Sequence, residues 1–132
     1  MTEFPSERMA VVDLEASPEH FSRAKRPYVD TMLIVAEPYF KSLETARRFH
    51  GLAEGLDFDH LAVVGNRARN GDGEILQEYC ERHGFELATV VPQDDSFQDA
   101  ERLGVAPIDH TPDSAGVAAI RELATRLQER AA

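Results

Sequence analysis

Four short runs of mostly apolar residues, rich in β-branched side chains, recur along the chain. They cover residues 9–14, 31–36, 60–64 and 87–91. The runs are almost continuously apolar instead of alternating with polar residues, which is typical of strands buried between two layers of helices. We therefore expect one central, mostly parallel sheet.

Between these runs, apolar residues recur three and four positions apart, which is the spacing of a helix with one buried face. We expect helices over residues 42–54, 72–83, 96–103 and 112–130. Ser42, Ser96 and Thr111 are predicted as N-caps, because a side-chain oxygen there accepts a hydrogen bond from the first turn. The order β-α-β-α-β-α-β-α-α predicts a doubly wound α/β fold with right-handed crossovers, which binds ligands near the carboxyl ends of its strands.

The length of 132 residues predicts a single domain over residues 9–130, since domains commonly hold about 100 to 150 residues. Residues 1–8 are polar and acidic and are expected to form an N-terminal extension. No apolar stretch approaches the roughly 20 residues that cross a bilayer. The single cysteine, Cys80, excludes a disulfide within the chain and is expected to be a buried thiol. We expect a cytoplasmic protein with no membrane partner.

The acidic charge balance narrows the classes of partner and ligand. There are 24 Asp and Glu against 14 Lys and Arg, which gives a formal net charge of −10. DNA and RNA favour basic surfaces, so a nucleic-acid partner is not expected. The histidines show no paired spacing of metal ligands on one helix, so no metal site is predicted.

Polar side chains gather where the predicted strands end. The candidates are Asp13, Asn66, Arg67, Pro92, Gln93 and Asp94. Turns and helix caps explain each of them singly, since Asp, Asn and Pro serve the backbone at such places. The alternative is a binding site, because the amide of Asn66 offers both a donor and an acceptor to the edge of a purine. Both interpretations remain open for Asn66.

Five segments occur in a fixed order along the chain, namely VVDLEASPEHFSR, LIVAEP, VVGNRARN, VVPQDD and DHTPDS. Together they resemble the carbon monoxide dehydrogenase maturation ATPases, the CooC-like members of the MinD/ParA/ArsA group of P-loop ATPases. The resemblance extends from about residue 9 to residue 128. The chain matches the C-terminal half of these ATPases. The resemblance therefore implies a partial P-loop-NTPase-like fold, which is a Rossmann-like three-layer sandwich with a mostly parallel central sheet.

The resemblance also implies a base-binding role for two segments. Asn66 and Arg67 match an Asn-Lys segment that contacts adenine in the family, with arginine in place of the lysine. Pro92, Gln93 and Asp94 match a turn that borders the base, largely through its backbone. Recognition of the base is therefore expected to persist.

The phosphate-binding part of the family pattern is missing. Asp13 matches the Walker B aspartate, which is associated with Mg²⁺ beside bound phosphates. The sequence contains no G-x-x-x-x-G-K-[ST] or G-x-G-x-x-G loop, whose backbone amides and lysine position the phosphates. We therefore expect ATP or ADP with Mg²⁺ to bind weakly or with the help of a partner, and we expect no ATP hydrolysis by this chain alone.

Two functions follow as hypotheses. The first is the nucleotide-binding half of a CooC/MinD-like ATPase, with a P-loop-bearing partner chain or a homodimer and a metalloenzyme client. The alternative is a non-catalytic interaction domain that dimerises, or pairs with a related ATPase, through an open edge of its sheet. A response-regulator or flavodoxin-like domain shares the alternation of elements, but its acidic phosphorylation pocket or flavin phosphate loop is not assembled in this sequence.

Overall fold

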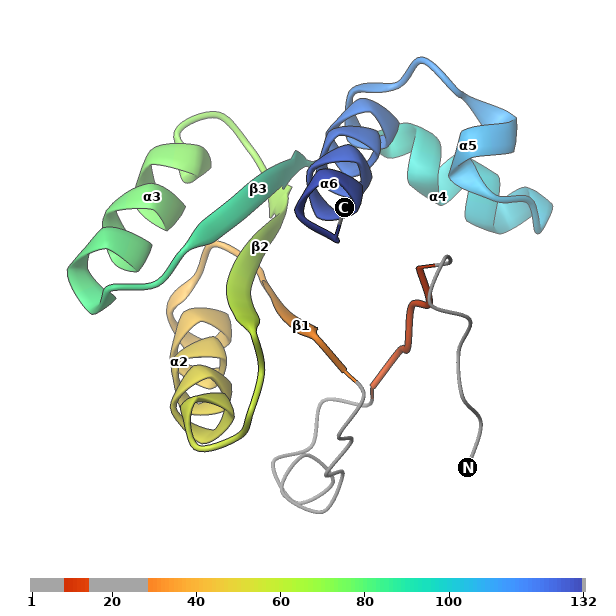
Figure 1. Ribbon diagram of the computed structural model, residues 1–132. Helices are drawn as coiled ribbons and strands as arrows, with labels where there is room; N and C mark the ends of the chain where they lie inside the picture. Colours follow the sequence, from red (N-terminus) through yellow and green to blue (C-terminus); the bar gives the residue numbers. More distant parts are fainter. Residues whose placement is uncertain (1–8, 15–28, 132) are drawn as a thin grey trace.

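The computed structural model of the chain describes residues 9–14 and 29–131 (Figure 1). Its centre is a parallel sheet of three strands in the order β1-β2-β3. The strands are β1 (Thr31–Ala36), β2 (His60–Ala68) and β3 (Leu87–Pro92). The predicted α/β class with a parallel central sheet is confirmed. The predicted extension at residues 1–8 lies outside the described residues.

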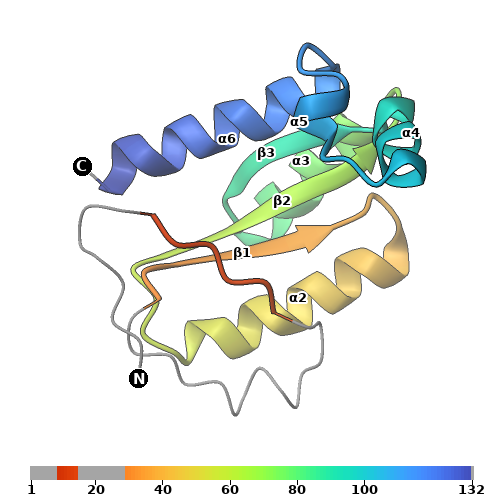
Figure 2. The same cartoon turned by 90° about the vertical axis from the view of Figure 1, so that its right-hand side faces the viewer.

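Helices cover both faces of the sheet, so the fold has three layers (Figure 1). α2 (Phe40–Glu54) and α3 (Asp72–His83) lie on one face, and α6 (Ala115–Ala131) lies on the other. α4 (Asp95–Leu103) and the short α5 (Pro107–His110) lie beyond the carboxyl ends of the strands (Figure 2). No helix within the described ranges has the length and apolar character of a membrane span.

The buried core has one part on each face of the sheet. Toward α2 and α3, the largest fully buried side chains are Leu76, Val63 and Cys80. The expected burial of the Cys80 thiol is confirmed, and that burial raises its pKa. Toward α6, Val64 and Val91 pack against apolar residues of that helix.

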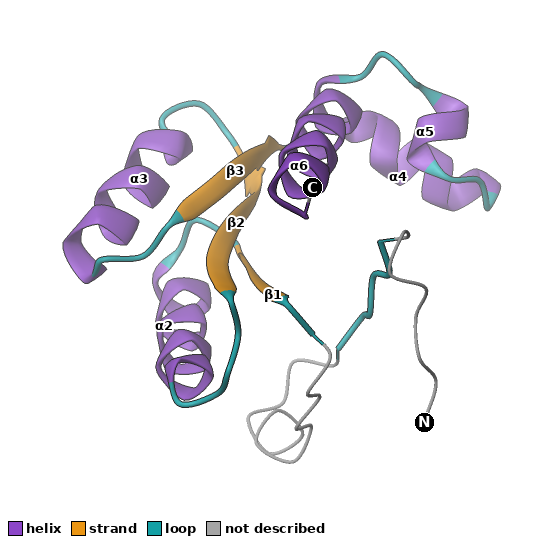
Figure 3. Cartoon of the chain, viewed as in Figure 1, coloured by secondary structure: helices purple, strands orange, loops and turns teal. Residues whose placement is uncertain are grey.

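Residues 9–14 do not form a strand, so this prediction was wrong. The segment is irregular (Figure 3) and the Val11 side chain within it is 90% exposed. An apolar run becomes a strand only where a neighbouring strand pairs with its backbone groups and another layer covers its side chains. Within the described ranges, β1 pairs with β2 alone, so the other edge of β1 is open.

α2 begins earlier than predicted, at Phe40. Its N-cap is Tyr39, whose side chain makes no capping hydrogen bond. Ser42, the predicted cap, lies inside the helix, and its Oγ accepts a hydrogen bond from the N–H of Glu37 at 2.8 Å. Ser42 therefore fixes the turn between β1 and α2 rather than the first turn of the helix.

α6 begins later than predicted, at Ala115. Thr111, the predicted N-cap, is instead the C-cap of α5. Pro107 stands at the start of α5, where its fixed φ and missing N–H favour a helix, so it nucleates a turn that the sequence analysis missed. Ser114 caps α6, since its Oγ accepts a hydrogen bond from the N–H of Val117 at 3.2 Å.

The ladder between β2 and β3 is irregular near its start. The register shifts between Val63 and Val64, so Ala88 is an extra residue in β3. Bulged residues lose their partners in the ladder. Arg126 Nη1, on α6, donates a hydrogen bond to the carbonyl oxygen of Ala88 at 2.7 Å. α6 is therefore bonded to the backbone of β3 as well as packed on its side chains.

Candidate functional site

A second irregularity shapes the carboxyl end of β2. The register with β3 shifts between Gly65 and Ala68, so Asn66 and Arg67 together lie opposite one residue, Val91. Arg67 has a φ of 54°, in the left-handed region that residues other than glycine seldom adopt. Bulges redirect side chains, and they are common beside functional sites. Here the bulge lets two consecutive residues, Asn66 and Arg67, line the same hollow.

The turn after β3 forms the opposite wall of this hollow. The N–H of Gln93 donates to the carbonyl oxygen of Ala68 at 2.9 Å, which fixes the turn to the end of β2. Asp94, rather than the predicted Ser96, is the N-cap of α4. Asp94 Oδ1 accepts hydrogen bonds from the N–H and the hydroxyl of Ser96 at 3.0 and 2.6 Å. Asp94 Oδ2 accepts a bond from the N–H of Gly116 at 2.8 Å.

These hydrogen bonds stabilise the ionised form of Asp94. They lower the pKa of the carboxyl group from 3.8 to about 2, and the hydroxyl of Ser96 is the largest cause. The N–H of Gly116 lowers the pKa further, because it donates to the carboxylate from another helix. The Asp94 side chain is therefore a junction between α4 and α6, and a ligand would meet this turn mainly through its backbone.

The bulge and the turn enclose a shallow pocket of about 570 Å³. All of the residues predicted to border a base line it, namely Asn66, Arg67, Pro92, Gln93 and Asp94. α4 contributes four residues to the same pocket, namely Phe97, Gln98, Glu101 and Arg102. The sequence analysis missed these four residues, although an aromatic residue in the first turn after the Pro92–Asp94 segment was an available signal.

The structure does not bring Asp13 into this pocket. Asp13 lies in the irregular, exposed segment 9–14, and it is not among the residues that line the hollow. Its expected association with Mg²⁺ depended on a position at the end of a strand that is not formed. The Walker B role of Asp13 therefore stays a prediction.

An ion pair joins the end of β1 to the bulge. Arg67 Nη1 lies 3.3 Å from Glu37 Oε1. The Glu37 carboxylate also accepts a hydrogen bond from the hydroxyl of Tyr39. The Arg67 side chain is 68% exposed and that of Glu37 is 24% exposed, so solvent reaches the pair mainly from the side of the arginine. Exposed ion pairs are individually weak, on the order of 0 to 1 kcal/mol.

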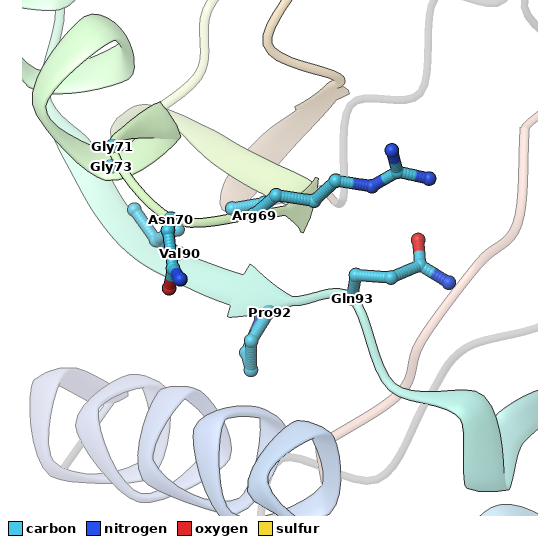
Figure 4. A pocket seen from close by; sticks show the side chains of 8 residues that line it. Arg69, Asn70, Gly71, Gly73, Val90, Pro92 and Gln93 are labelled. Atoms are coloured by element: carbon cyan, nitrogen blue, oxygen red, sulfur yellow. The ribbon is translucent and has the colours of Figure 1, made fainter.

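A second hollow, of about 540 Å³, adjoins the first, since Pro92 and Gln93 line both (Figure 4). Arg69 and Asn70 line it from the segment that leads into α3. The N–H of Arg69 donates to Asp72 Oδ2 at 2.8 Å, which fixes the backbone of this segment. The side chains of Arg69 and Gln93 extend in the same direction, whereas those of Asn70 and Pro92 point another way (Figure 4).

Comparisons with known proteins place this geometry in context. No family model matches the chain. An uncharacterized ATP-binding protein of Methanocaldococcus jannaschii is 41% identical over 99 residues, which are 74% of this chain and 38% of that protein. The carbon monoxide dehydrogenase accessory protein CooC of Rhodospirillum rubrum is 32% identical over 103 residues, 77% of this chain and 38% of CooC. The MinD cell division protein of Aquifex aeolicus superposes with a TM-score of 0.66 and 25% identity, over 76% of this chain and 44% of MinD.

The chain has the α/β P-loop-NTPase fold of MinD and ParA proteins. It shares with them a parallel sheet between two helical layers, and its pocket lies at the strand ends. By sequence the chain is a homologue of an ATP-binding protein and of CooC, and by structure it is similar to MinD, which confirms the predicted resemblance. The chain spans 38% of the length of each of the two curated relatives, so it corresponds to a part of each.

Proposed function

We propose that the chain binds the base of an adenine nucleotide in the pocket between the β2 bulge and the start of α4. One observation carries the proposal. Residues from the ends of two strands, which the sequence analysis singled out for base binding, line one pocket. The volume of about 570 Å³ falls within the range of about 300 to 1,000 Å³ for small-molecule sites.

The chemistry of the lining suits a nucleobase. The amide of Asn66 can donate one hydrogen bond and accept another at the edge of a base. Pro92 and Phe97 offer apolar surface to its faces. The N–H of Gln93 is already bonded to Ala68 and proline has no N–H, so the free backbone groups at Pro92 and Gln93 are carbonyl oxygens. Acceptors of this kind match the amino group of adenine.

ATP hydrolysis would need groups that this pocket does not contain. Phosphoryl transfer depends on a cradle of backbone amides, a lysine and a positioned Mg²⁺. Asp13 does not line the pocket, and the sequence holds no phosphate loop of the Walker A type. We therefore assign ATP hydrolysis, and tight binding of Mg²⁺ and the phosphates, to a complex of this chain with a P-loop-bearing partner. That complex would act on a metalloenzyme client.

Calorimetric titration of the purified chain with Mg²⁺-ADP and Mg²⁺-ATP tests the base site. Saturable binding is expected, and Asn66→Ala should weaken it about ten-fold, since the variant loses hydrogen bonds that total about 1 to 2 kcal/mol. Gln77→Ala is the control, because Gln77 carries an exposed side-chain amide on α3 and lines neither hollow. Failure of the wild-type chain to bind, or equal binding by both variants, would contradict the proposal.

The open edge of β1 favours a second function, that of an interaction domain. β1 pairs with β2 alone within the described part of the chain, and the Val35 side chain on β1 is 63% exposed. An edge strand with exposed apolar side chains is a template for pairing with another chain. This function predicts dimers or heteromers whose stability does not respond to nucleotide. Sedimentation equilibrium that gives a monomer at high concentration would exclude self-association.

A further inference from the structure

Two arginines flank the carboxyl end of β2, and their surroundings differ. Arg67 is held in an ion pair with Glu37 at 3.3 Å. Arg69 is exposed, and its side chain forms no salt bridge with an acidic group in the described segments. Asp72 engages its backbone twice, because the N–H of Arg69 donates to Asp72 Oδ2 and the carbonyl oxygen of Arg69 accepts from the N–H of Asp72. The guanidinium of Arg69 is therefore free to contact an anion, whereas that of Arg67 has an acidic competitor.

Both arginines are placed beside the proposed base site. Arg67 lines the pocket itself. Arg69 extends in the same direction as Gln93, and Gln93 lines the pocket (Figure 4). A ligand with its base against Asn66 would therefore have cationic groups within reach of the part that leaves the pocket. These groups matter because a chain with a net charge of −10 otherwise repels anions.

We infer that the end of β2 selects ligands by their phosphate charge, an inference that rests on the proposed base site. Arg69 contacts the phosphates of a nucleoside diphosphate or triphosphate. Glu37 limits the preference for these ligands by holding Arg67 in an ion pair. Arginine suits the role because its planar guanidinium makes paired, charge-assisted hydrogen bonds to phosphate oxygens. The Arg67 guanidinium in this pair is largely exposed, so a phosphate group can approach it and compete with the Glu37 carboxylate.

The constrained backbone of Arg67 supports this role for Glu37. With a φ of 54°, Arg67 is a non-glycine residue held in an unfavoured conformation. The bulge fixes the direction of its side chain, and the carboxylate of Glu37 meets the guanidinium where the side chain ends. Removal of the negative charge at residue 37 would leave Arg67 in place and free its charge for a ligand.

The test compares adenosine with ADP, both titrated calorimetrically into the full chain without Mg²⁺. Arg69→Gln should weaken ADP binding about five-fold and leave adenosine binding unchanged, as expected for one exposed ionic contact. Glu37→Gln should strengthen ADP binding about two- to five-fold, again with adenosine unchanged. Arg82→Gln and Glu78→Gln are the matched controls, because these residues form an exposed ion pair on α3, outside both hollows. Neither control should alter the ratio of the two affinities.

The outcomes separate this inference from the proposed base site. If the wild-type chain binds neither adenosine nor ADP, the base site and the charge selection both fail. If adenosine binds and Asn66→Ala weakens that binding about ten-fold, the base site stands. The charge selection then fails alone if Arg69→Gln and Glu37→Gln leave the ratio of ADP to adenosine affinity at its wild-type value. Circular dichroism of each variant establishes that it is folded.

Discussion

Gly65 in β2 lies directly against Leu76 in α3, and a Cβ atom built on this glycine would be 2.5 Å from Leu76 Cδ1. Leu76 is 0% exposed and belongs to the core between the sheet and α3. A Cβ atom at this position would therefore force Leu76 to shift within the buried core. The absence of a side chain at Gly65 sets how closely α3 approaches the strand that carries the bulge.

Gly65→Ala should therefore destabilise the chain by about 1 to 3 kcal/mol, the usual cost of overfilling a packed core. The measurement is urea denaturation followed by circular dichroism. Gly73→Ala is the matched control, since a Cβ at Gly73 would meet no atom within 4 Å. Alanine is also the better helix former, so this control should be neutral or stabilising by up to about 1 kcal/mol. Equal effects of the two substitutions would contradict the assigned contact.

The bond between Arg126 and the bulged Ala88 predicts a second effect on stability. Arg126→Met retains an apolar side chain but removes the donor to the Ala88 carbonyl oxygen. We expect a loss of about 1 to 2 kcal/mol, because a partly buried acceptor loses its partner. Arg121→Met, on the same helix, is the control and should change the unfolding free energy by less than about 0.5 kcal/mol. If the Arg126→Met variant is as stable as the control, the Ala88 carbonyl oxygen has another hydrogen-bond donor and the assigned effect is contradicted.

The lowered pKa of Asp94 predicts a dependence of stability on acid pH. A carboxyl group whose folded pKa is about 2, below its ordinary value of 3.8, stabilises the fold when ionised. This contribution is complete above about pH 4 and is lost as the pH falls through about 2. Between pH 4 and pH 2, the unfolding free energy should decline more steeply for the wild type than for Asp94→Asn. Parallel urea titrations at each pH would measure the two slopes, and identical slopes would contradict the assignment.

The proposed dependence on a partner leads to a prediction about Asp13. Mixing the chain with a homologue that supplies a P-loop should produce Mg²⁺-dependent release of phosphate from ATP. Asp13→Ala should abolish this activity if Asp13 takes the Walker B position in the complex. Asp30→Ala is a control at another exposed aspartate close to the start of β1. No gain of activity with any such partner would argue against a split ATPase and in favour of the interaction domain.

Most of the sheet and its helices could be predicted because they follow local rules. β1 and α3 begin and end at the expected residues, since apolar spacing defines the buried face and Gly84, at φ 72°, ends α3. Residues 9–14 failed because an apolar run shows which side chains favour burial but not whether a partner strand is present. The predicted caps Ser42, Ser96 and Thr111 failed because neighbouring residues, Asp94 and Pro107 among them, compete for the same helix starts.

The sequence analysis named residues that share one pocket, but it did not predict how that pocket is built, and the binding role of these residues stays a prediction. The resemblance singled out Asn66, Arg67 and the turn after β3, and the structure brings them to one pocket. The bulge was not foreseen, because a shift of register depends on two strands at once. The Glu37–Arg67 pair and the bond from Asp94 to Gly116 were not foreseen either, since both join residues far apart in the sequence.

The direction of α6 has a practical consequence. This helix runs back along the sheet, so its last turn lies where the strands begin, and Arg130 there lies 3.9 Å from Glu86, just before β3 (Figure 2). The pocket lies at the opposite end of the sheet, because residues from the carboxyl ends of β2 and β3 and from α4 line it. A biotin tag or a fluorescent label joined after residue 131 would therefore be remote from the pocket, so the chain can be immobilised on a sensor surface with its pocket facing the solution.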